Sequence, residues 1–280
     1  MEDKEKKENK IDDFSHITML DQISISVTSP KQYKHLVKLR TGRLVWFIVL
    51  VTFIFAFIEF GIEAIAWVGK VGGFKKLAME VIPPFTYEDE ALSMEQDYQL
   101  DIGDMKLYIN TENEEVSLKD MDVDGVYVTI GSKSLNMGIV SNGMTYTYME
   151  MPVKYLIFSN SFDNESLAAL SPLFYAYIIF MFVCVMVSCA VRHLMLALIL
   201  SLVVNGVANR LHTGLTYGKV FAVCVYSLTL VMFVMSVNMA MGVILPSFAV
   251  WMLGMFVAMM YANKAIISMS NLDVPPGSFF

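Results

Sequence analysis

The sequence predicts an α-helical membrane protein with four to five transmembrane helices and an inserted extracytoplasmic domain of the α+β type, rich in β-strands. Hydrophobic residues make up 56% of the chain and charged residues only 17%, whereas soluble domains carry about 25% charge. Long apolar runs lie at 44–58 and 171–262, while most acidic residues lie at 80–165. Only this acidic part shows the two-residue hydrophobic period of strands.

Residues 1–43 are predicted to form a cytoplasmic tail that ends in a basic juxtamembrane segment. Residues 1–30 are polar and show no sustained helix or strand period, so we expect a mobile tail that becomes ordered near Pro30. The segment 31–43 carries five Lys or Arg residues and no acid, which suits the surface of an anionic leaflet. The positive-inside rule then places the N-terminus in the cytoplasm.

The segment 44–68 is predicted to be the first transmembrane helix. Its apolar run of about 25 residues is longer, at 1.5 Å per residue, than the roughly 30 Å hydrocarbon core. Ala64-Ile65-Ala66 has the composition of a signal-peptide cleavage site. The long leader and the long apolar run favour an uncleaved signal anchor instead.

Residues 69–170 are predicted to form an acidic, β-rich domain outside the cytoplasm. From Lys70 to Leu170 there are 17 acidic residues against 7 lysines, a net charge of −10. A short helix is expected near the start of this domain, ended by Pro83-Pro84. Beyond it, apolar or β-branched residues alternate with polar ones.

Four segments with this alternation are predicted strands: 105–112, 124–131, 135–141 and 144–150. Asn142-Gly143 and Asp124-Gly125 are dipeptides favoured in type I′ hairpin turns. We therefore expect a small antiparallel sheet. The spacing leaves open whether it forms a sandwich or packs against one helix.

Residues 171–265 are predicted to form a C-terminal transmembrane bundle, followed by a tail at 266–280. Four apolar segments make up the bundle: 171–191, 194–209, 220–241 and 243–262. Arg192-His193, between the first two, is interpreted as a membrane boundary. The positive-inside rule favours four crossings, with 194–209 not crossing, whereas the hydrophobicity of 194–209 favours five. Because the number of crossings is open, the side of the membrane on which the C-terminus lies is open as well.

Several short motifs occur in a specific order along the chain. They are Ser29-Pro30-Lys31, Ile82-Pro83-Pro84-Phe85-Thr86-Tyr87-Glu88, Tyr146-Thr147-Tyr148, Leu215-Thr216-Tyr217-Gly218-Lys219 and Val225-Tyr226-Ser227-Leu228-Thr229. In this order they resemble the bacterial membrane family catalogued as domain of unknown function 1189, over residues from about 25 to 265. The sequence departs from that pattern in a thinner basic loop before Tyr217 and in Leu230, where a proline is usual. The resemblance implies a plasma membrane location, since the family occurs mostly in Gram-positive bacteria, and it implies no activity.

Glu59 and Glu63 are candidate ligand- or ion-binding residues in the first apolar run. Their spacing of four places them on one face of an α-helix. A carboxylate within hydrocarbon is costly, so it is a functional hypothesis by default. The pair either binds a proton or cation facing the bundle or reaches the outer headgroup level, where water solvates both charges.

Two further groups of polar residues are candidate sites. Asn205 and Asn209 belong to a polar stripe on 194–209, which suits either a ligand or ordinary hydrogen bonds between helices. Asp120, Asp122 and Asp124 copy the first half of a calcium-binding loop. The twelfth position of that loop is a glycine rather than a glutamate, so an acidic turn explains the same residues.

No metalloprotease, hydrolase, P-loop or dinucleotide motif occurs in the sequence, so we expect neither an enzyme nor a cofactor. The only basic cluster lies beside a predicted span, which argues against a nucleic acid partner. The expected partners are the lipid bilayer and a membrane or envelope protein. The leading hypothesis is a non-enzymatic plasma-membrane protein whose outer domain binds or senses an envelope component or protein partner. The alternative is a transporter or channel component that uses Glu59, Glu63 and the polar residues of 194–209.

Overall fold

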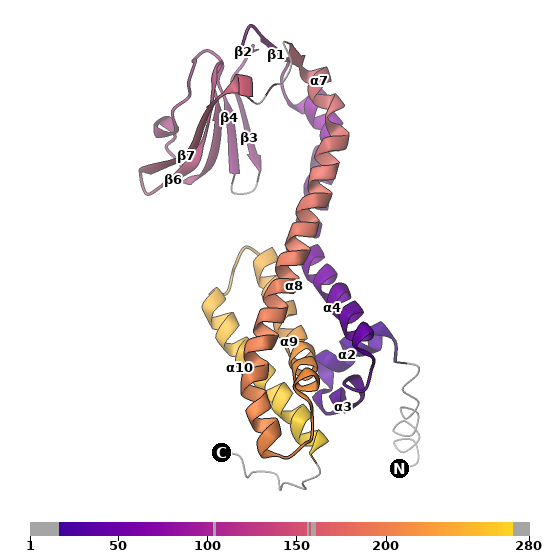
Figure 1. The fold of residues 1–280 in the computed structure, drawn as a ribbon. Helices are drawn as coiled ribbons and strands as arrows, with labels where there is room; N and C mark the ends of the chain where they lie inside the picture. The colour runs from indigo at the N-terminus through magenta and orange to yellow at the C-terminus, as the bar shows by residue number, and fades with distance from the viewer. Residues whose placement is uncertain (1–16, 103–104, 156, 158–160, 271–280) are drawn as a thin grey trace. The chain divides into compact units, whose positions relative to one another are not determined.

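The computed structural model describes residues 17–102, 105–155, 157 and 161–270. The chain divides into two compact units, drawn in Figure 1. The helical unit comprises Met1–Ala64 and Ile179–Phe280, and the strand-rich unit comprises Ile65–Ile178.

Four helices within the described residues are long and apolar enough to cross a membrane. The first, Thr41–Val71, consists of α4 (Thr41–Ala56), a π-helical turn η4 (Phe57–Gly61) and α5 (Ile62–Val71). The other three are α8 (Ser171–Arg210), α9 (Tyr217–Ala240) and α10 (Ser247–Met269).

The helix α8 is continuous over 40 residues. The two apolar segments on either side of Arg192-His193 are therefore parts of one helix, and whether these two residues lie at a membrane boundary stays a prediction. Neither residue breaks a helix, and both have partners in the helical unit. His193 is fully buried, with Nε2 2.9 Å from the carbonyl oxygen of Val225, while Arg192 forms an ion pair with Glu59.

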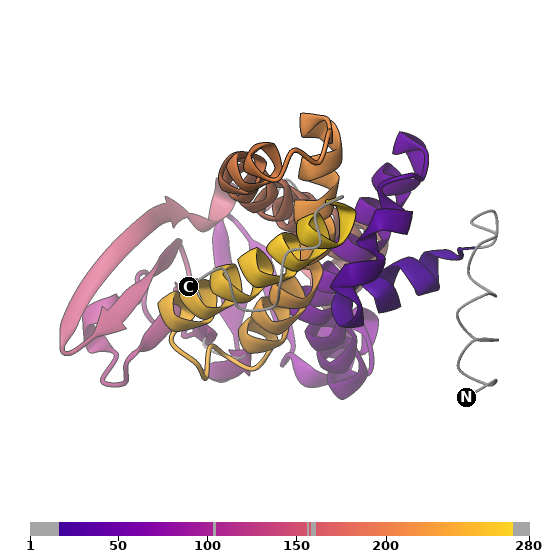
Figure 2. The same cartoon turned by 90° about the horizontal axis from the view of Figure 1, so that it is seen from below.

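The helix α9 lies at the centre of the helical unit and contacts α2 (Met19–Thr28), α4, η4 and α10. Tyr226 on α9 is buried, and its ring centroid lies 4.7 Å from that of Phe47 on α4. Figure 2 shows α10 alongside α9. At Gly254 of α10 an added Cβ atom would come within 2.3 Å of the Val231 side chain. Small residues permit such a close approach of two apolar helices.

From residue 17 onward, three short helices precede the first apolar helix: α2, η3 (Pro30–Gln32) and α3 (Tyr33–Leu36). The expectation of a mobile tail up to Pro30 is wrong for 19–28, and its remainder at 1–16 lies outside the described residues. The α2 helix begins with a capping box, in which Thr18 and Asp21 each bond the other's backbone N–H. The Tyr33 hydroxyl also donates to the carbonyl oxygen of Ser26. Burial of Tyr33 raises its pKa.

The strand-rich unit contains two sheets. The smaller has the order β2-β1-β8, formed by Ala91–Met94, Phe85–Glu88 and Phe162–Asp163. The larger has the order β3-β4-β5-β6-β7, formed by Tyr98–Ile102, Met105–Ile109, Gly125–Ile130, Ser134–Ser141 and Met144–Pro152. The last four of these overlap the four strands predicted from alternation; β4 and β5 are shorter than predicted, and β6 and β7 are longer.

The larger sheet is mixed rather than antiparallel, because β4 and β5 pair in parallel, from Met105 opposite Val126 to Ile109 opposite Ile130. A connection containing the turn η6 (Leu118–Asp120) makes this crossover. The prediction of a hairpin at Asp124-Gly125 is consequently wrong. The hairpin at Asn142-Gly143 is confirmed, since both residues have positive φ, 52° and 74°, and join β6 to antiparallel β7.

The predicted helix before Pro83 is present as α6 (Phe74–Lys76) followed by the π-helical turn η5 (Leu77–Val81). It contacts α7 (Asn164–Ala169). The Asn164 side chain donates to the carbonyl oxygen of Ala78 at 2.8 Å and accepts from the backbone N–H of Phe85 at 2.9 Å. One amide thereby joins this helix, β1 and α7.

Candidate functional site

Glu59 lies on the π-helical turn η4, in the middle of the first apolar helix. The turn is closed by a hydrogen bond from the backbone N–H of Ile62 to the carbonyl oxygen of Phe57, five residues earlier. Such turns inside α-helices occur frequently at functional sites. The Glu59 side chain is only 9% exposed, so its charge needs partners within the protein.

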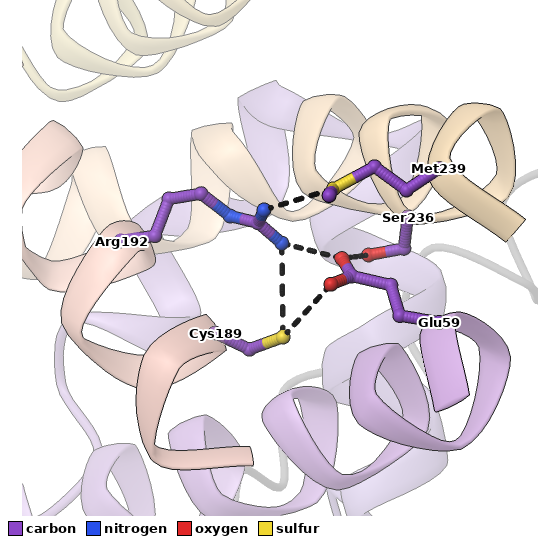
Figure 3. A network of polar contacts seen from close by, with 5 residues as sticks. All are labelled: Glu59, Cys189, Arg192, Ser236 and Met239. Atoms are coloured by element: carbon purple, nitrogen blue, oxygen red, sulfur yellow. Dashed lines mark hydrogen bonds and ion pairs between the residues drawn. The ribbon is translucent and has the colours of Figure 1, made fainter. Parts of the chain in front are cut away.

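Three side chains from two other helices surround the Glu59 carboxylate (Figure 3). Arg192 on α8 forms an ion pair with Oε1 through Nη2. Ser236 on α9 donates to the same oxygen at 2.7 Å. Cys189, one turn before Arg192, places Sγ 3.6 Å from Oε2. The site thus joins η4, α8 and α9, which are far apart in sequence.

The guanidinium of Arg192 has further contacts in this network. Its Nη1 lies 3.3 Å from the Met239 Sδ atom, and its Nη2 lies 3.6 Å from the Cys189 Sγ atom. Its Nε is buried and has no hydrogen-bond partner among the described residues. The Arg192 side chain as a whole is 27% exposed, so the network does not fully enclose it.

The geometry describes a neutralised ion pair rather than an open cation site. Two opposite charges in an apolar setting compensate each other, and removal of one partner leaves the other uncompensated. The Ser236 hydroxyl supplies a directed hydrogen bond that fixes the carboxylate. The network can hold η4 against α8 and α9. A change of charge on any of its residues would change these contacts between the helices.

The structure does not bring Glu63 into this site. Glu63 is exposed and makes no side-chain hydrogen bond or ion pair in the described part of the chain. The expectation that Glu59 and Glu63 share one helical face assumes 3.6 residues per turn. In the structure the Glu59 side chain is nevertheless largely buried among residues of α8 and α9, whereas Glu63 is exposed.

The two candidate asparagines of α8 are also separate from Glu59. Asn205 is partly buried and Asn209 is exposed, and neither side chain has a hydrogen bond among the residues that the structure describes. Asn205 follows Arg192 by 13 residues, which is about 20 Å along a helix. In the same polar stripe, Ser201 is buried, and its Oγ lies 2.7 Å from the Tyr217 hydroxyl. This contact joins two consecutive helices.

The aspartates of the calcium-like motif do not form a metal site. No group of three or more His, Cys, Asp or Glu side chains suited to a metal occurs within the described ranges. Asp120 ends the turn η6, whereas Asp124 accepts a hydrogen bond from the backbone N–H of Asn142 at 2.9 Å. That bond joins the start of β5 to the β6–β7 hairpin, which is a structural role.

Sequence reasoning missed Arg192, Ser236 and Cys189 as partners of Glu59. A signal for Arg192 was available: it is an isolated arginine in an apolar run, and such a charge usually pairs with an opposite charge. For Ser236 and Cys189 no signal exists in the sequence, because serine and cysteine are ordinary in apolar helices.

The strand-rich unit holds a second candidate site, a cavity of about 560 Å³. Side chains from both sheets and from α7 line it, and all twelve lining residues are apolar. Ligand pockets of proteins have volumes of about 300–1,000 Å³. The cavity is therefore large enough for a ligand.

The fold and these sites define an α+β protein with a strand-rich unit inserted between two of four helices that are apolar and long enough to cross a membrane. The chain belongs to the family described as protein of unknown function (DUF1189), whose family model matches residues 20–266. The resemblance inferred from the short motifs is thereby confirmed. No curated protein and no solved structure matches the chain.

Proposed function

We propose that the chain is a multi-pass plasma-membrane protein whose strand-rich unit lies outside the cytoplasm and binds or senses an envelope component or a protein partner. One observation carries this proposal. A separately packed unit with its own ligand-sized cavity is inserted between two helices that are both apolar and long enough to cross a bilayer.

The distribution of basic residues supports an arrangement with four crossings. If each of the four apolar helices crosses once, the basic segment 31–43, the loop from Arg210 to Lys219 and Lys264 all lie on one side. The positive-inside rule makes that side the cytoplasm. The strand-rich unit then lies on the other side, and both termini are cytoplasmic.

Cysteine accessibility tests this topology. In a background with Cys184, Cys189 and Cys224 replaced by alanine, Met144→Cys on exposed β7 should react with a membrane-impermeant maleimide added to intact cells. Thr213→Cys, in the loop before α9, should react only after permeabilisation. Protection of Met144→Cys in intact cells would contradict the external placement. Reaction of Thr213→Cys from outside would contradict four crossings.

Deletion of 85–165 tests the binding role. The apolar helices should still insert, because their hydrophobic runs lie outside the deleted range. Partners captured by crosslinking to the full chain in cells should be lost from the deleted form. An unchanged set of crosslinked molecules would contradict a binding role for the strand-rich unit.

A second candidate function, a transporter or channel component, is supported by the Glu59 network alone. Charged side chains among apolar helices frequently mark ion or proton pathways, and here a carboxylate meets an arginine at a π-helical turn. Glu59→Gln should then alter proton or cation flux in proteoliposomes, with Glu63→Gln as the matched control. Equal flux in the two variants and the parent chain would contradict transport through Glu59.

A further inference from the structure

Every side chain that lines the cavity of the strand-rich unit is apolar. Ile82, Phe85, Leu107, Ile130 and Phe162 all line it and are only partly buried, so their apolar surfaces are not fully covered by protein. The unit around the cavity is strongly acidic, with a net charge of −10 between Lys70 and Leu170. The general composition of this unit is acidic, so it does not account for a cavity lined only by apolar side chains.

The wall excludes most classes of ligand. A peptide or a sugar placed in this cavity would bury amide or hydroxyl groups without hydrogen-bond partners, because no lining side chain offers one. The pocket is open on one side, and water inside it gains few hydrogen bonds from an apolar wall, so a chain that displaces this water buries apolar surface favourably. A hydrocarbon chain can fill the cavity without burying any unpaired polar group of its own, because it carries none.

The position of the lining residues indicates where the hydrocarbon comes from. Leu170 lines the cavity and directly precedes Ser171, the first residue of the apolar helix α8. Ile82 lines it too and directly follows the helical segment Phe74–Val81. Two of the lining residues thus lie near the ends of two of the four helices that are long enough to cross a bilayer: Leu170 directly precedes α8, and Ile82 lies eleven residues after Val71, the last residue of the first apolar helix.

The same part of the unit concentrates positive charge. Of the 7 lysines between Lys70 and Leu170, three are Lys70, Lys75 and Lys76, and all three are exposed. The Lys76 Nζ lies 3.7 Å from Glu80 Oε2, so part of this positive charge is compensated within the unit. Lys75 and Lys76 lie on α6, which contacts α7, and Leu167 of α7 lines the cavity. Basic side chains near an apolar site suit a lipid, whose phosphate remains outside while one chain enters.

We propose that this cavity binds one hydrocarbon chain of a membrane phospholipid, which makes the strand-rich unit a lipid-binding module. The proposal rests on the proposed function, because the envelope component that the unit binds is here assigned to the class of membrane lipids.

Photocrosslinking in vesicles tests this assignment on the full chain. The protein is reconstituted into phosphatidylcholine vesicles that contain a small and increasing fraction of phosphatidylglycerol with a diazirine near the end of one acyl chain. After illumination, labelled peptides are mapped by mass spectrometry. We expect label on the four apolar helices, from bulk lipid, and also on the strands that line the cavity. Label on the strands should saturate with probe, whereas label on the helices should rise in proportion to it.

Two variants separate the cavity from the rest of the unit. Leu107→Trp fills the cavity from β4 and should lower strand labelling about tenfold, equivalent to ~1.4 kcal/mol of binding free energy. Val123→Trp adds the same ring at an exposed position outside the cavity and should leave strand labelling unchanged. If Leu107→Trp fails to fold, competition on the parent chain replaces it: unlabelled phosphatidylglycerol in excess should remove strand label.

Each other outcome overturns the assignment. Label confined to the helices, strand label that does not saturate, or equal strand label in both tryptophan variants would each exclude a lipid chain in the cavity. Strand label from a free diazirine fatty acid but not from the phospholipid probe would exclude a membrane lipid as the ligand. The accessibility of Met144→Cys distinguishes failure of this assignment from failure of the proposed function. If Met144→Cys reacts from outside, a negative crosslinking result excludes only the lipid chain, and the proposed function stands. If Met144→Cys does not react from outside, the proposed function itself is wrong.

Discussion

Arg192 on α8 forms an ion pair with Glu59 on the π-helical turn of the first apolar helix, across a sequence separation of 133 residues. Both residues lie within long apolar helices, where an isolated charge is costly. The ion pair therefore couples the packing of α8 to the conformation of the first apolar helix.

Removal of one charge from this pair should destabilise the protein more than removal of both. Glu59→Leu leaves the arginine without its counter-charge and should cost about 3 kcal/mol, the low end for a buried ion pair, because Arg192 is partly exposed. The double variant Glu59→Leu with Arg192→Leu should recover most of that loss. Unfolding by sodium dodecyl sulfate in mixed micelles, followed by circular dichroism, measures all four forms of the cycle. Additive single effects would show that the two charges are not coupled.

Ser236→Ala should weaken the same network by removing the hydroxyl that donates to Glu59 Oε1 at 2.7 Å. A hydrogen bond to a charged group contributes about 1.5–3 kcal/mol. Thr52→Val is a matched control, because the buried Thr52 hydroxyl bonds only carbonyl oxygens of its own helix. The same micelle unfolding assay should show a loss for Ser236→Ala and little change for Thr52→Val. Equal losses would assign the Ser236 effect to general packing.

Ala258→Leu should separate α10 from α9. Ala258 is fully buried on α10, like Ala262 and Ala265, and close packing of apolar helices requires small residues. Overpacking of this kind costs about 1–3 kcal/mol. Ala249→Leu makes the same change at an exposed position of the same helix and should be neutral. Thermal unfolding of the purified protein in detergent compares them, and equal stability of the two variants would contradict the packing of α10 on α9.

The stability of α7 should fall at acid pH through Asp163. Its carboxylate accepts hydrogen bonds from the Ser166 backbone N–H at 2.8 Å and from the Ser166 hydroxyl. These bonds lower the pKa of Asp163 below its usual value of 3.8. Since the folded-state pKa is the lower one, the stabilisation is present above about pH 4 and is lost as the pH falls through the folded-state value. Asp163→Asn keeps an N-cap but removes the titration.

Thermal melts of the parent chain and of Asp163→Asn between pH 3 and pH 6 check this prediction. The difference in melting temperature between the two should shrink below about pH 4, because the parent carboxylate becomes protonated. A constant difference over the whole range would mean that Asp163 does not titrate in this window.

The sequence by itself determined the elements that depend on local chemistry. Apolar length identified the first apolar helix, α9 and α10, and it identified the segments 171–191 and 194–209, which the structure joins in the single helix α8. Alternation located β4 to β7, Asn142-Gly143 specified its hairpin, and Pro83-Pro84 followed the helix that they were expected to end. The strands β1, β2, β3 and β8 were missed, and three of them, β1, β2 and β8, have only two to four residues, too few to show an alternation. The helix α2 had a local signal, the Thr18–Asp21 capping box.

The tertiary structure decided how these elements combine. Only the tertiary structure shows that Arg192 lies within one continuous helix and meets Glu59, and that the Glu59 side chain is largely buried beside it while Glu63 is exposed. Only the crossover through η6 makes β4 and β5 parallel, and only the two sheets with α7 together enclose the apolar cavity. Periodicity and turn chemistry act over a few residues, whereas these contacts join segments far apart in the chain. Their free energy depends on the packed protein, so no local pattern of the sequence encodes them.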